Sequence, residues 1–530
     1  MPLDIPSQEV DTLKLKRTRR WLHKVINRIT LTALLLLLQF SWMVWTIVAL
    51  AQYALWIQAV LYLVSAVIAV HIIRRDENPA YKIGWILLTC ALPLFGGLVY
   101  FLFGNKHLSR RMRKKLQRVE DQQKSLVTLT QEPLTTAVSL PPRFRATARY
   151  LSDIAVAPAW NGTDVRYFAL GDGLYPELLK DLKQARRYIF MEYFIIAKGE
   201  MLDGILEILR EKAGEGVDVR IIYDDIGCEA AELYRFSQEM EQIGIRCLPF
   251  NPIIPLISTV MNHRDHRKIT VIDGEIAYTG GINIADEYIN RKERFGHWKD
   301  TGLRLRGKAV WNFTVMFLEM WNAFRPTEED YTPFRSEVAP PPPTPEMPLM
   351  VQPYGDSPLD GENVGETVYL EILAQAEQYV YIFTPYLIID SEMQTALCEA
   401  AKRGVDVRIV TPGIPDKKTA FHLTRSYYPV LLNAGVRIYE YTPGFIHAKS
   451  FVCDDQIGVV GTINMDYRSL YLHFECGTLF YGGQAVSDLR ADAEATFAVS
   501  RPVAPKDLSR PRAFWRRLYD ALLRALSPLF

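Results

Sequence analysis

Apolar residues follow one another almost without interruption from Ile29 to Ile73, and the main polar exceptions are Gln39, Gln52 and Gln58. A helix that crosses a bilayer needs about 20 apolar residues, so this run predicts two transmembrane helices with a tight turn near residues 51–53. A buried helical hairpin of a soluble protein is the alternative. The purely aliphatic block Leu34–Leu38, with basic residues clustered before the run, favours the membrane.

A further apolar run extends from Ile83 to Phe103 and is interrupted by Pro93, Gly96 and Gly97. Basic residues are concentrated in residues 14–28, which predicts a cytoplasmic N-terminus, and again in residues 106–118. A full crossing by this run would place the second basic cluster outside, whereas a re-entrant or interfacial segment would keep both clusters in the cytoplasm. We therefore expect a membrane module over residues 29–105, with two transmembrane helices plus a third or re-entrant segment.

From residue 150 to residue 500, short β-rich runs alternate with helical patterns, as is typical of α/β units around a sheet. Strands are expected at Tyr188–Ile196 and Val217–Tyr223, with a helix at Leu202–Ala213 between them. The prolines of Arg325–Pro348 predict a stiff, extended linker rather than a packed element. The predicted segments are a basic cytoplasmic N-terminus (1–28), the membrane module (29–105), a basic connector (106–150), a first half (151–325), a Pro-rich linker (326–350), a second half (351–500) and a basic amphipathic C-terminal helix (501–530).

The two sides of the linker resemble each other. Three pairs of segments keep their order along the chain: Tyr188–Phe194 with Tyr381–Leu387, Gly216–Asp225 with Gly404–Gly413, and Gly244–Pro252 with Gly435–Pro443. Chance similarity of a single strand is common, but three similar segments in the same order are not. The chain is therefore predicted to hold two copies of one α/β half, packed face to face about a pseudo-two-fold axis.

Charge is distributed unevenly along the 530 residues, although the net charge is only +1. Residues 1–120 carry 17 Lys and Arg against 6 Asp and Glu, so the remainder of the chain is acidic. A basic, apolar head predicts contact with anionic lipid, and a mildly acidic body argues against binding of long nucleic acid. The C-terminal segment 501–530 fits either docking on the catalytic body or binding at a membrane interface.

Each half contains one copy of a histidine–lysine–aspartate motif of the form H-x-K-x4-D-x6-G-[GT]-x-N. The first copy supplies His266, Lys268, Asp273 and Asn283, and the second supplies His447, Lys449, Asp454 and Asn464. Residues i and i+2 of a strand share a face, so the His and Lys of each copy are expected to point together. A single H-x-K is usually incidental, but two complete copies inside an internal repeat predict one composite site.

Two histidines and two lysines at a pseudo-two-fold axis suit the chemistry of a phosphodiester. The lysine ammonium groups and asparagine amides would stabilise charge on the non-bridging oxygens. One imidazole would attack phosphorus and form a phospho-histidine, while the other would protonate the leaving oxygen and then deprotonate the incoming hydroxyl. Each Asp is expected to hold its His in the right tautomer. Because the protein supplies the positive charge, and the six cysteines lack metal-site spacing, no metal or other cofactor is predicted.

With these motifs the chain resembles the phospholipase D superfamily, and more narrowly the bacterial cardiolipin synthases. Three segments carry the narrower similarity: Asn78–Leu108, Gly296–Gly307 ("GHWKDTGLRLRG") and Gly461–Ser469 ("GTINMDYRS"). The resemblance implies an α/β fold in which two pseudo-symmetric α-β-α halves share one active site and follow N-terminal transmembrane helices. It also implies roles for named residues: His266, Lys268, Asp273, His447, Lys449 and Asp454 as catalytic, Asn283 and Asn464 as phosphate-binding, and Glu475 and Asp300 as supporting acids. Family precedent makes His266 the nucleophile and His447 the general acid, although pseudo-symmetry leaves this assignment open.

The reaction implied by the resemblance is transfer of a phosphatidyl group between two phosphatidylglycerol molecules, which gives cardiolipin and glycerol. The expected partners are phosphatidylglycerol and anionic membrane lipid, without nucleic acid, and a homo-oligomer is compatible with the sequence. The expected location is the bacterial plasma membrane, as a multi-pass protein, with one helix more than is usual in the family. Hydrolytic phospholipase D and phosphatidylserine synthase are the alternatives at the same site. A nuclease would need a basic groove, and a non-enzymatic scaffold would not need two intact motifs.

Overall fold

The computed structural model describes residues 28–49, 51–75, 78–104, 113–119, 140–229, 235–252, 263–327, 330–359, 361–505, 521 and 523–524. The chain forms two compact units, one with the apolar N-terminal helices and one with nearly all of residues 107–528. Nearly all of the predicted N-terminus (1–28), most of the connector (106–150) and most of the C-terminal helix (501–530) lie outside the described residues.

The described residues of the N-terminal unit form four apolar helices: α2 (Arg28–Ala49), α3 (Ala51–Ile73), α4 (Pro79–Ala91) and α5 (Pro93–Phe103). Within the described residues, one helical segment, Leu55–Ile73, is long and apolar enough to cross a membrane. α4 and α5 have only 13 and 11 residues, because Pro93 starts a new helix at the position where its missing N–H costs no hydrogen bond. Neither helix reaches the length of about 20 residues that a crossing requires, as the interrupted apolar run predicts.

The polar residues of this unit have local partners. Gln39 Oε1 accepts a hydrogen bond of 3.1 Å from the N–H of Phe95, which is one of the unpaired donors at the start of α5. Ser65 Oγ donates to the carbonyl of Thr89 at 3.1 Å. An unsatisfied polar group costs several kcal/mol in hydrocarbon, so these bonds explain how an apolar helical unit accommodates polar residues.

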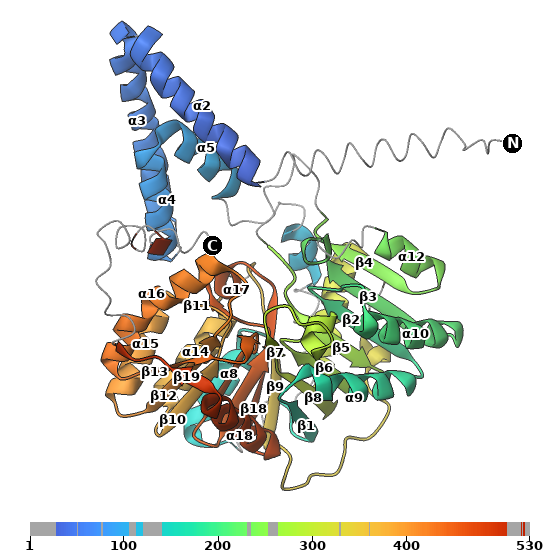
Figure 1. The fold of residues 1–530 in the computed structure, drawn as a ribbon. Coiled ribbons are helices and arrows are strands. Elements are labelled where there is room, and N and C mark those ends of the chain that lie inside the picture. The colour runs from blue at the N-terminus through green and yellow to red at the C-terminus, as the bar shows by residue number, and fades with distance from the viewer. Residues whose placement is uncertain are drawn as a thin grey trace, which may run out of the picture. The chain divides into compact units, whose positions relative to one another are not determined.

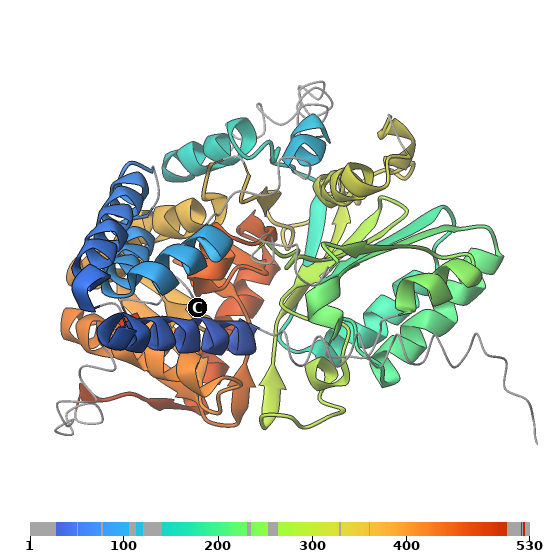
Figure 2. The same cartoon turned by 90° about the horizontal axis from the view of Figure 1, so that it is seen from above.

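The second unit contains two large sheets with the same strand order (Figure 1). The first sheet runs β1 (Thr163–Phe168), β8 (Gly302–Gly307), β6 (Ile276–Gly280), β5 (Lys268–Ile272), β2 (Tyr188–Tyr193), β3 (Asp218–Asp224) and β4 (Arg246–Phe250). The second runs β9 (Met350–Asp356), β18 (Glu475–Tyr481), β16 (Ile457–Gly461), β15 (Ser450–Cys453), β10 (Tyr379–Phe383), β12 (Asp406–Pro412), β13 (Arg437–Tyr441) and β19 (Ser500–Pro502). Apart from the additional β19, the two orders match, which confirms the predicted repeat. Seen from above, the two halves lie side by side (Figure 2).

The structure corrects one of the three predicted segment pairs. Asp273 caps the backbone N–H groups of residues 186–188, and Asp454 caps those of residues 377–379. Tyr188 is therefore equivalent to Tyr379, whereas the sequence pairing aligned it with Tyr381. The error is a shift of two residues. Because side chains alternate with a period of two, such a shift preserves the inward and outward pattern of a strand and leaves no trace in it.

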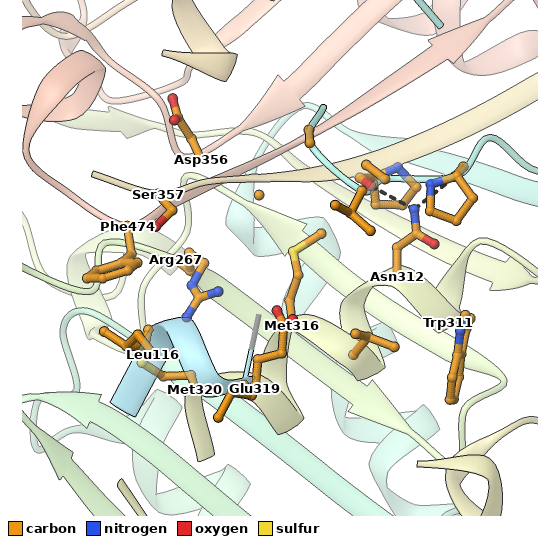
Figure 3. A pocket seen from close by; sticks show the side chains of 18 of the residues that line it. Leu116, Arg267, Trp311, Asn312, Met316, Glu319, Met320, Asp356, Ser357 and Phe474 are labelled. Atoms are coloured by element: carbon orange, nitrogen blue, oxygen red, sulfur yellow. Dashed lines mark hydrogen bonds between the residues drawn. The ribbon is translucent and has the colours of Figure 1, made fainter. Parts of the chain in front are cut away.

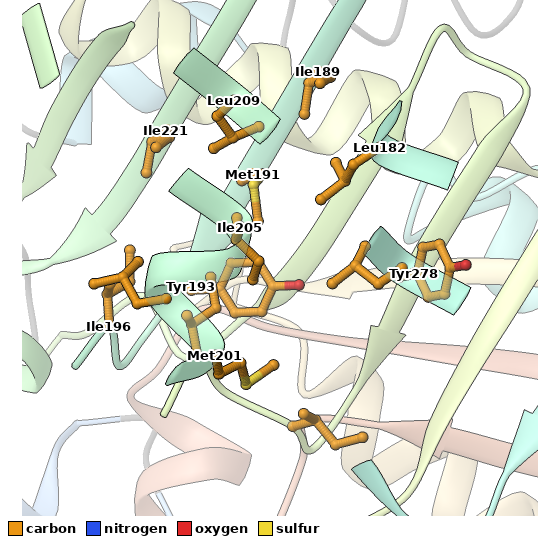
Figure 4. Packing of buried hydrophobic residues seen from close by; sticks show 14 of the residues in the cluster. Leu182, Ile189, Met191, Tyr193, Ile196, Met201, Ile205, Leu209, Ile221 and Tyr278 are labelled. Carbon is orange, nitrogen blue, oxygen red and sulfur yellow. The ribbon is translucent and has the colours of Figure 1, made fainter. Parts of the chain in front are cut away.

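Helices cover both faces of the first sheet. Ile189 and Met191 of β2 belong to a core that also includes residues of α9 (Gly171–Lys183) and α10 (Glu200–Gly214) (Figure 4). Phe190, between them, points to the opposite face and stacks on Phe317 of α13 (Val310–Phe324) with centroids 4.5 Å apart. Other helices with described bounds are α8 (Pro142–Asp153), α11 (Asp225–Glu229), α12 (Phe236–Gln242), α14 (Val364–Gln375), α15 (Ser391–Lys402), α16 (Lys418–Ala434), α17 (Tyr467–Tyr471) and α18 (Gln484–Ala498).

The first part of the Pro-rich linker is a packed element, contrary to the prediction. The short 3-10 helix η3 (Thr332–Phe334) lies against β2, where the Tyr188 hydroxyl donates to the Phe334 carbonyl at 2.6 Å. The rings of these two residues meet edge to face, with centroids 5.3 Å apart. Buried aromatic contact outweighs the local proline signal here. Residues 340–343 are exposed or half-buried and have no regular structure, as predicted.

Candidate active site

Two short strand pairings between the halves bring the motifs together. β7 (His297–Lys299) runs parallel to β14 (Gly444–Ile446), and the N–H of His447 donates to the Lys299 carbonyl at 2.7 Å. A parallel bridge joins Asp265 to Phe474, and the N–H of His266 donates to the Phe474 carbonyl at 2.9 Å. The N–H of each motif histidine thus bonds to the opposite half, at the residue that directly precedes the supporting acid of that half.

The two supporting acids bind the histidines crosswise. Both carboxylate oxygens of Glu475 lie 2.9 Å from Nδ1 of His266, and Oδ2 of Asp300 lies 2.6 Å from Nδ1 of His447. Both carboxylates are fully buried. A carboxylate that accepts a hydrogen bond from Nδ1–H keeps the proton on Nδ1. The lone pair of the neutral ring is then on Nε2, where it is available for chemistry. Asp300 therefore lies beside His447 as Glu475 lies beside His266, and each acid contacts the histidine of the other half.

The motif aspartates do not contact the histidines, and the prediction that they hold the tautomers is wrong. The carboxylate of Asp273 accepts three backbone N–H bonds of 2.8 to 2.9 Å, from residues 186–188, and that of Asp454 accepts three from residues 377–379. Asp273 has a φ of 54° and follows the last residue of β5, at the opposite end from Lys268. A strand rises about 3.3 Å per residue, so five residues carry the aspartate far from the histidine.

The motif lysines are buried beside the histidines, as the i and i+2 spacing predicts. Lys268 Nζ donates to the His266 carbonyl, and Lys449 Nζ lies 2.8 Å from Nδ1 of His447. Burial lowers the pKa of Lys268 to about 8, and burial together with the charge of Lys268 lowers the pKa of Lys449 to about 7. Burial and the neighbouring lysine also lower the pKa of His266 to about 3 and that of His447 to about 4. Both imidazoles are therefore neutral at pH 7 in the free site.

The lysine pKa values predict an early alkaline limit for activity. As pH rises through 7 and then 8, Lys449 and Lys268 lose the charges that would bind a phosphodiester anion, so kcat/KM is expected to fall. The measurement is a pH profile of kcat/KM, which reports the groups of the free enzyme. Thermal unfolding over the same pH range controls for loss of fold. A profile that stays flat to pH 9 would contradict this prediction.

The [GT] position of the motif is Gly281 in the first half and Thr462 in the second, and this difference follows from the difference between the two acids. A Cβ at Gly281 would lie 2.0 Å from Oδ1 of Asp300, so only glycine fits there. Thr462, at the equivalent position of the second half, donates its hydroxyl to Oε2 of Glu475. The G-[GT] variation in the motif therefore reflects how each carboxylate is held.

Gly281→Ala is expected to lower activity by about 10²-fold, because the added methyl group must displace the Asp300 carboxylate from His447. A cost in unfolding free energy of about 1–3 kcal/mol is expected from overpacking. The measurements are turnover and thermal unfolding. Gly214→Ala is the matched control, since nothing lies within 4 Å of a Cβ there. Normal activity in Gly281→Ala would show that the position of Asp300 does not matter.

Asn283 and Asn464 occupy equivalent positions but have different partners. Asn283 accepts from the N–H of Ile195 at 3.0 Å and donates to the Tyr288 hydroxyl at 2.7 Å. Oδ1 of Asn464 is buried and has no hydrogen-bond partner among the described residues. Phosphate binding by the two asparagines stays a prediction, and it would require the side-chain N–H groups, because an amide oxygen can only accept.

Sequence reasoning missed the buried ion pairs that hold the His266 segment. Arg267 Nε lies 3.1 Å from Asp265 Oδ1, and its Nη2 contacts the fully buried Glu192. Asp224 Oδ2 accepts from the N–H of Asp265 at 3.1 Å. Arg267 and Phe474 also line a cavity of about 120 Å³ (Figure 3). The contact between Asp265 and Arg267 is local, but no local pattern indicates those of Glu192 and Asp224, because these two residues come from β2 and β3.

One group of side chains at the site has a spacing that a metal ion could bridge. His266, His473 and Glu475 offer ligand atoms that all lie within 4.8 Å of one another. His473 was not among the predicted site residues, although its position two residues before Glu475 was a usable signal. The expectation of a metal-independent site stays a prediction.

Comparison with known proteins agrees with this geometry. Residues 178–309 and 369–496 match the family described as "Cardiolipin synthase, PLD-like domain", and residues 63–105 match "Phospholipase_D-nuclease N-terminal". A cardiolipin synthase of Geobacillus kaustophilus is 33% identical over 466 residues, which cover 87% of this chain and 91% of that protein. A Streptococcus mutans protein described as uncharacterized is 44% identical over 470 residues, covering 87% of this chain and 98% of that one.

Among solved structures, phosphatidylserine synthase of Haemophilus influenzae superposes with a TM-score of 0.53 at 15% identity, covering 72% of this chain and 97% of that one. At this identity the likeness concerns the fold alone. The family match includes both halves, and the Geobacillus relative extends it over most of the chain. The chain belongs to the cardiolipin synthase family of phospholipase D-like proteins.

Proposed function

We propose that this chain is a cardiolipin synthase that transfers a phosphatidyl group from one phosphatidylglycerol to a second, with cardiolipin and glycerol as products. The observation that carries the proposal is the pair of crossed contacts, His266 with Glu475 and His447 with Asp300, beside two buried lysines. Several family members of similar length bear the name cardiolipin synthase, which supports this substrate over a nucleic acid.

In the proposed first step, Nε2 of His266 attacks phosphorus and the bond from phosphorus to the glycerol oxygen breaks. His447 gives that oxygen its proton, so glycerol leaves as a neutral alcohol. A phosphodiester anion between the rings favours the protonated form of one of them, so the proton that His447 needs is taken up with the substrate. Lys268 and Lys449 balance the charge on the non-bridging oxygens.

In the second step, a hydroxyl of another phosphatidylglycerol gives its proton to His447 and attacks phosphorus. The bond to His266 breaks, and the ring returns to its neutral form. The covalent phosphatidyl-histidine explains why an alcohol competes with water, because the phosphatidyl group is held until the acceptor arrives.

We also propose that the N-terminal unit anchors the enzyme in the bacterial plasma membrane as a multi-pass protein. Leu55–Ile73 is long enough to span, and the apolar helix α2 precedes it. The short helices α4 and α5 support a re-entrant segment, which would keep residues 106–118 on the same side as the N-terminus. Labelling of an engineered cysteine near residue 122 in intact cells tests this, since labelling from outside would contradict it.

The test of the proposed function is incubation of the purified full-length protein with phosphatidylglycerol in lipid vesicles. Cardiolipin and glycerol are expected in equal amounts. Phosphatidic acid without cardiolipin would indicate a hydrolytic phospholipase D instead. Formation of phosphatidylserine from serine and a nucleotide-linked donor would indicate a phosphatidylserine synthase.

A further inference from the structure

The two sides of the active site differ in the residue that stands two positions before each acid. That residue is Trp298 in the first half and His473 in the second. The Trp298 and His447 ring centroids are 5.7 Å apart, and the His473 and His266 ring centroids are also 5.7 Å apart. The pseudo-symmetry therefore places a tryptophan beside one motif histidine and a third imidazole beside the other.

The surroundings of His447 are aromatic. Besides Trp298, the rings of Tyr288 and Phe445 lie 5.4 and 5.8 Å from its own. The Tyr288 hydroxyl is already bonded to Asn283. This side offers a ligand ring faces and one buried N–H, that of Trp298 Nε1, which has no hydrogen-bond partner among the described residues.

Beside His266 lies one aromatic ring, that of Phe194, with centroids 4.9 Å apart. The residues that correspond to Tyr288 and Trp298 are small or polar there and have unused hydrogen-bonding atoms. η2 (Asp286–Ile289) and α17 (Tyr467–Tyr471) each begin three residues after the motif asparagine, so Ser469 stands where the first half has Tyr288. Asn464 Oδ1 and Ser469 Oγ are buried without a hydrogen-bond partner among the described residues.

His473 also has unused hydrogen-bonding atoms, and it has two of them. Both of its ring nitrogens are buried, and neither has a hydrogen-bond partner in the described part of the chain. Its Nδ1 lies 3.8 Å from Oε1 of Glu475, which is too long for a hydrogen bond. Buried polar atoms are bonded in the great majority of cases, and exceptions at an active site point to a partner that arrives with the ligand.

We propose that His473 is a third histidine of the active site, which donates a ring N–H to a non-bridging oxygen of the phosphodiester held at His266. The same contact persists when the phosphoryl group is covalently attached to His266, so the polar side of the site is where that group rests between the two steps. This inference rests on the proposed function only for the statement that the bound phosphodiester is phosphatidylglycerol. The contact itself requires no more than a tetrahedral oxyanion beside His266.

The matched variants are His473→Phe, which removes the ring nitrogens, His473→Asn, which retains an N–H donor, and Trp298→Phe at the equivalent position of the other half. Because the His473 nitrogens have no hydrogen-bond partner within the described ranges, their removal takes no described hydrogen bond from the fold. Thermal unfolding checks this for each variant. The probe is orthovanadate, a phosphate-like oxyanion, whose binding to the full-length protein is followed by calorimetry. Because EDTA itself binds vanadate, the protein is dialysed against EDTA and returned to metal-free buffer without chelator, and protein that was not treated with EDTA is titrated in parallel. The kcat and KM for cardiolipin formation are measured alongside.

His473→Phe is expected to weaken vanadate binding by about 10- to 100-fold, as expected for loss of a hydrogen bond to a charged group, and to lower kcat/KM by a similar factor. His473→Asn should stay within about threefold of the wild type, because it retains an N–H donor. Trp298→Phe removes the Nε1 donor beside His447 and should bind vanadate normally, because the proposed contact lies on the His266 side. Unchanged vanadate binding in His473→Phe would overturn the proposal. So would equal effects of His473→Phe and Trp298→Phe, or binding that is lost in the protein dialysed against EDTA, which would make His473 a metal ligand. If the wild type binds vanadate through His473 but makes no cardiolipin, the proposed function fails and this inference stands.

Discussion

Replacing either His266 or His447 with alanine is expected to lower cardiolipin formation by about 10⁴-fold or more. When catalytic residues act as one unit, the loss of one member costs nearly as much activity as the loss of all of them. The two imidazoles belong to a single site, since each is held by an acid of the opposite half. The measurement is product formation from radiolabelled phosphatidylglycerol, with thermal unfolding as the control for fold. Near-normal activity in either variant would show that the two motifs work independently.

An activated substrate separates the roles of the two histidines. A phosphatidyl ester of p-nitrophenol needs no proton on its leaving group, so His447→Ala should still release a burst of nitrophenol and accumulate the phosphatidyl-histidine adduct. His266→Ala should give neither, because it lacks the nucleophile. The reverse pattern would assign the attack to His447. Mixing the two variants should restore nothing, since both histidines and both acids are required within one chain.

The parts of this protein that could be predicted from sequence are those whose signal is local. The spacing of His266, Lys268 and Asp273 is a property of one strand, and its repetition at His447 is enough to indicate a composite site. The break of the third apolar run at Pro93 is likewise a local property of proline. These features need no knowledge of which strands become neighbours.

The parts that could not be predicted depend on partners far apart in the chain. Glu475 follows His266 by 209 residues, and Asp300 precedes His447 by 147, so only the crossed pairing of the halves shows which acid serves which ring. The motif aspartates were assigned to the histidines because they are near in sequence, yet a five-residue strand separates them in space. The Tyr188 register was missed because a shift of two residues preserves the side-chain alternation.

The two sets of carboxylates should therefore respond differently to loss of charge. Glu475→Gln is expected to lower kcat by about 10²- to 10⁴-fold, because the new amide can donate to Nδ1 of His266 and so leave the proton on Nε2, where the lone pair is required. Asp300→Asn should have the same effect through His447. Binding of a phosphodiester should change much less, since both lysines remain. The measurement is kcat and KM for each variant, with vanadate binding as the check that the site is intact.

Asp273→Asn is the matched control, because it removes the same charge from a motif acid that contacts only backbone N–H groups. It is expected to lower the free energy of unfolding by about 1–3 kcal/mol, since one oxygen that accepts N–H bonds becomes a donor. Its kcat, measured well below the unfolding temperature, should stay within a fewfold of the wild type. A large loss of kcat in Asp273→Asn together with a small one in Glu475→Gln would reverse the assignment. The tautomers would then depend on the motif aspartates despite their distance from the rings, and the crossed contacts would only hold the halves together.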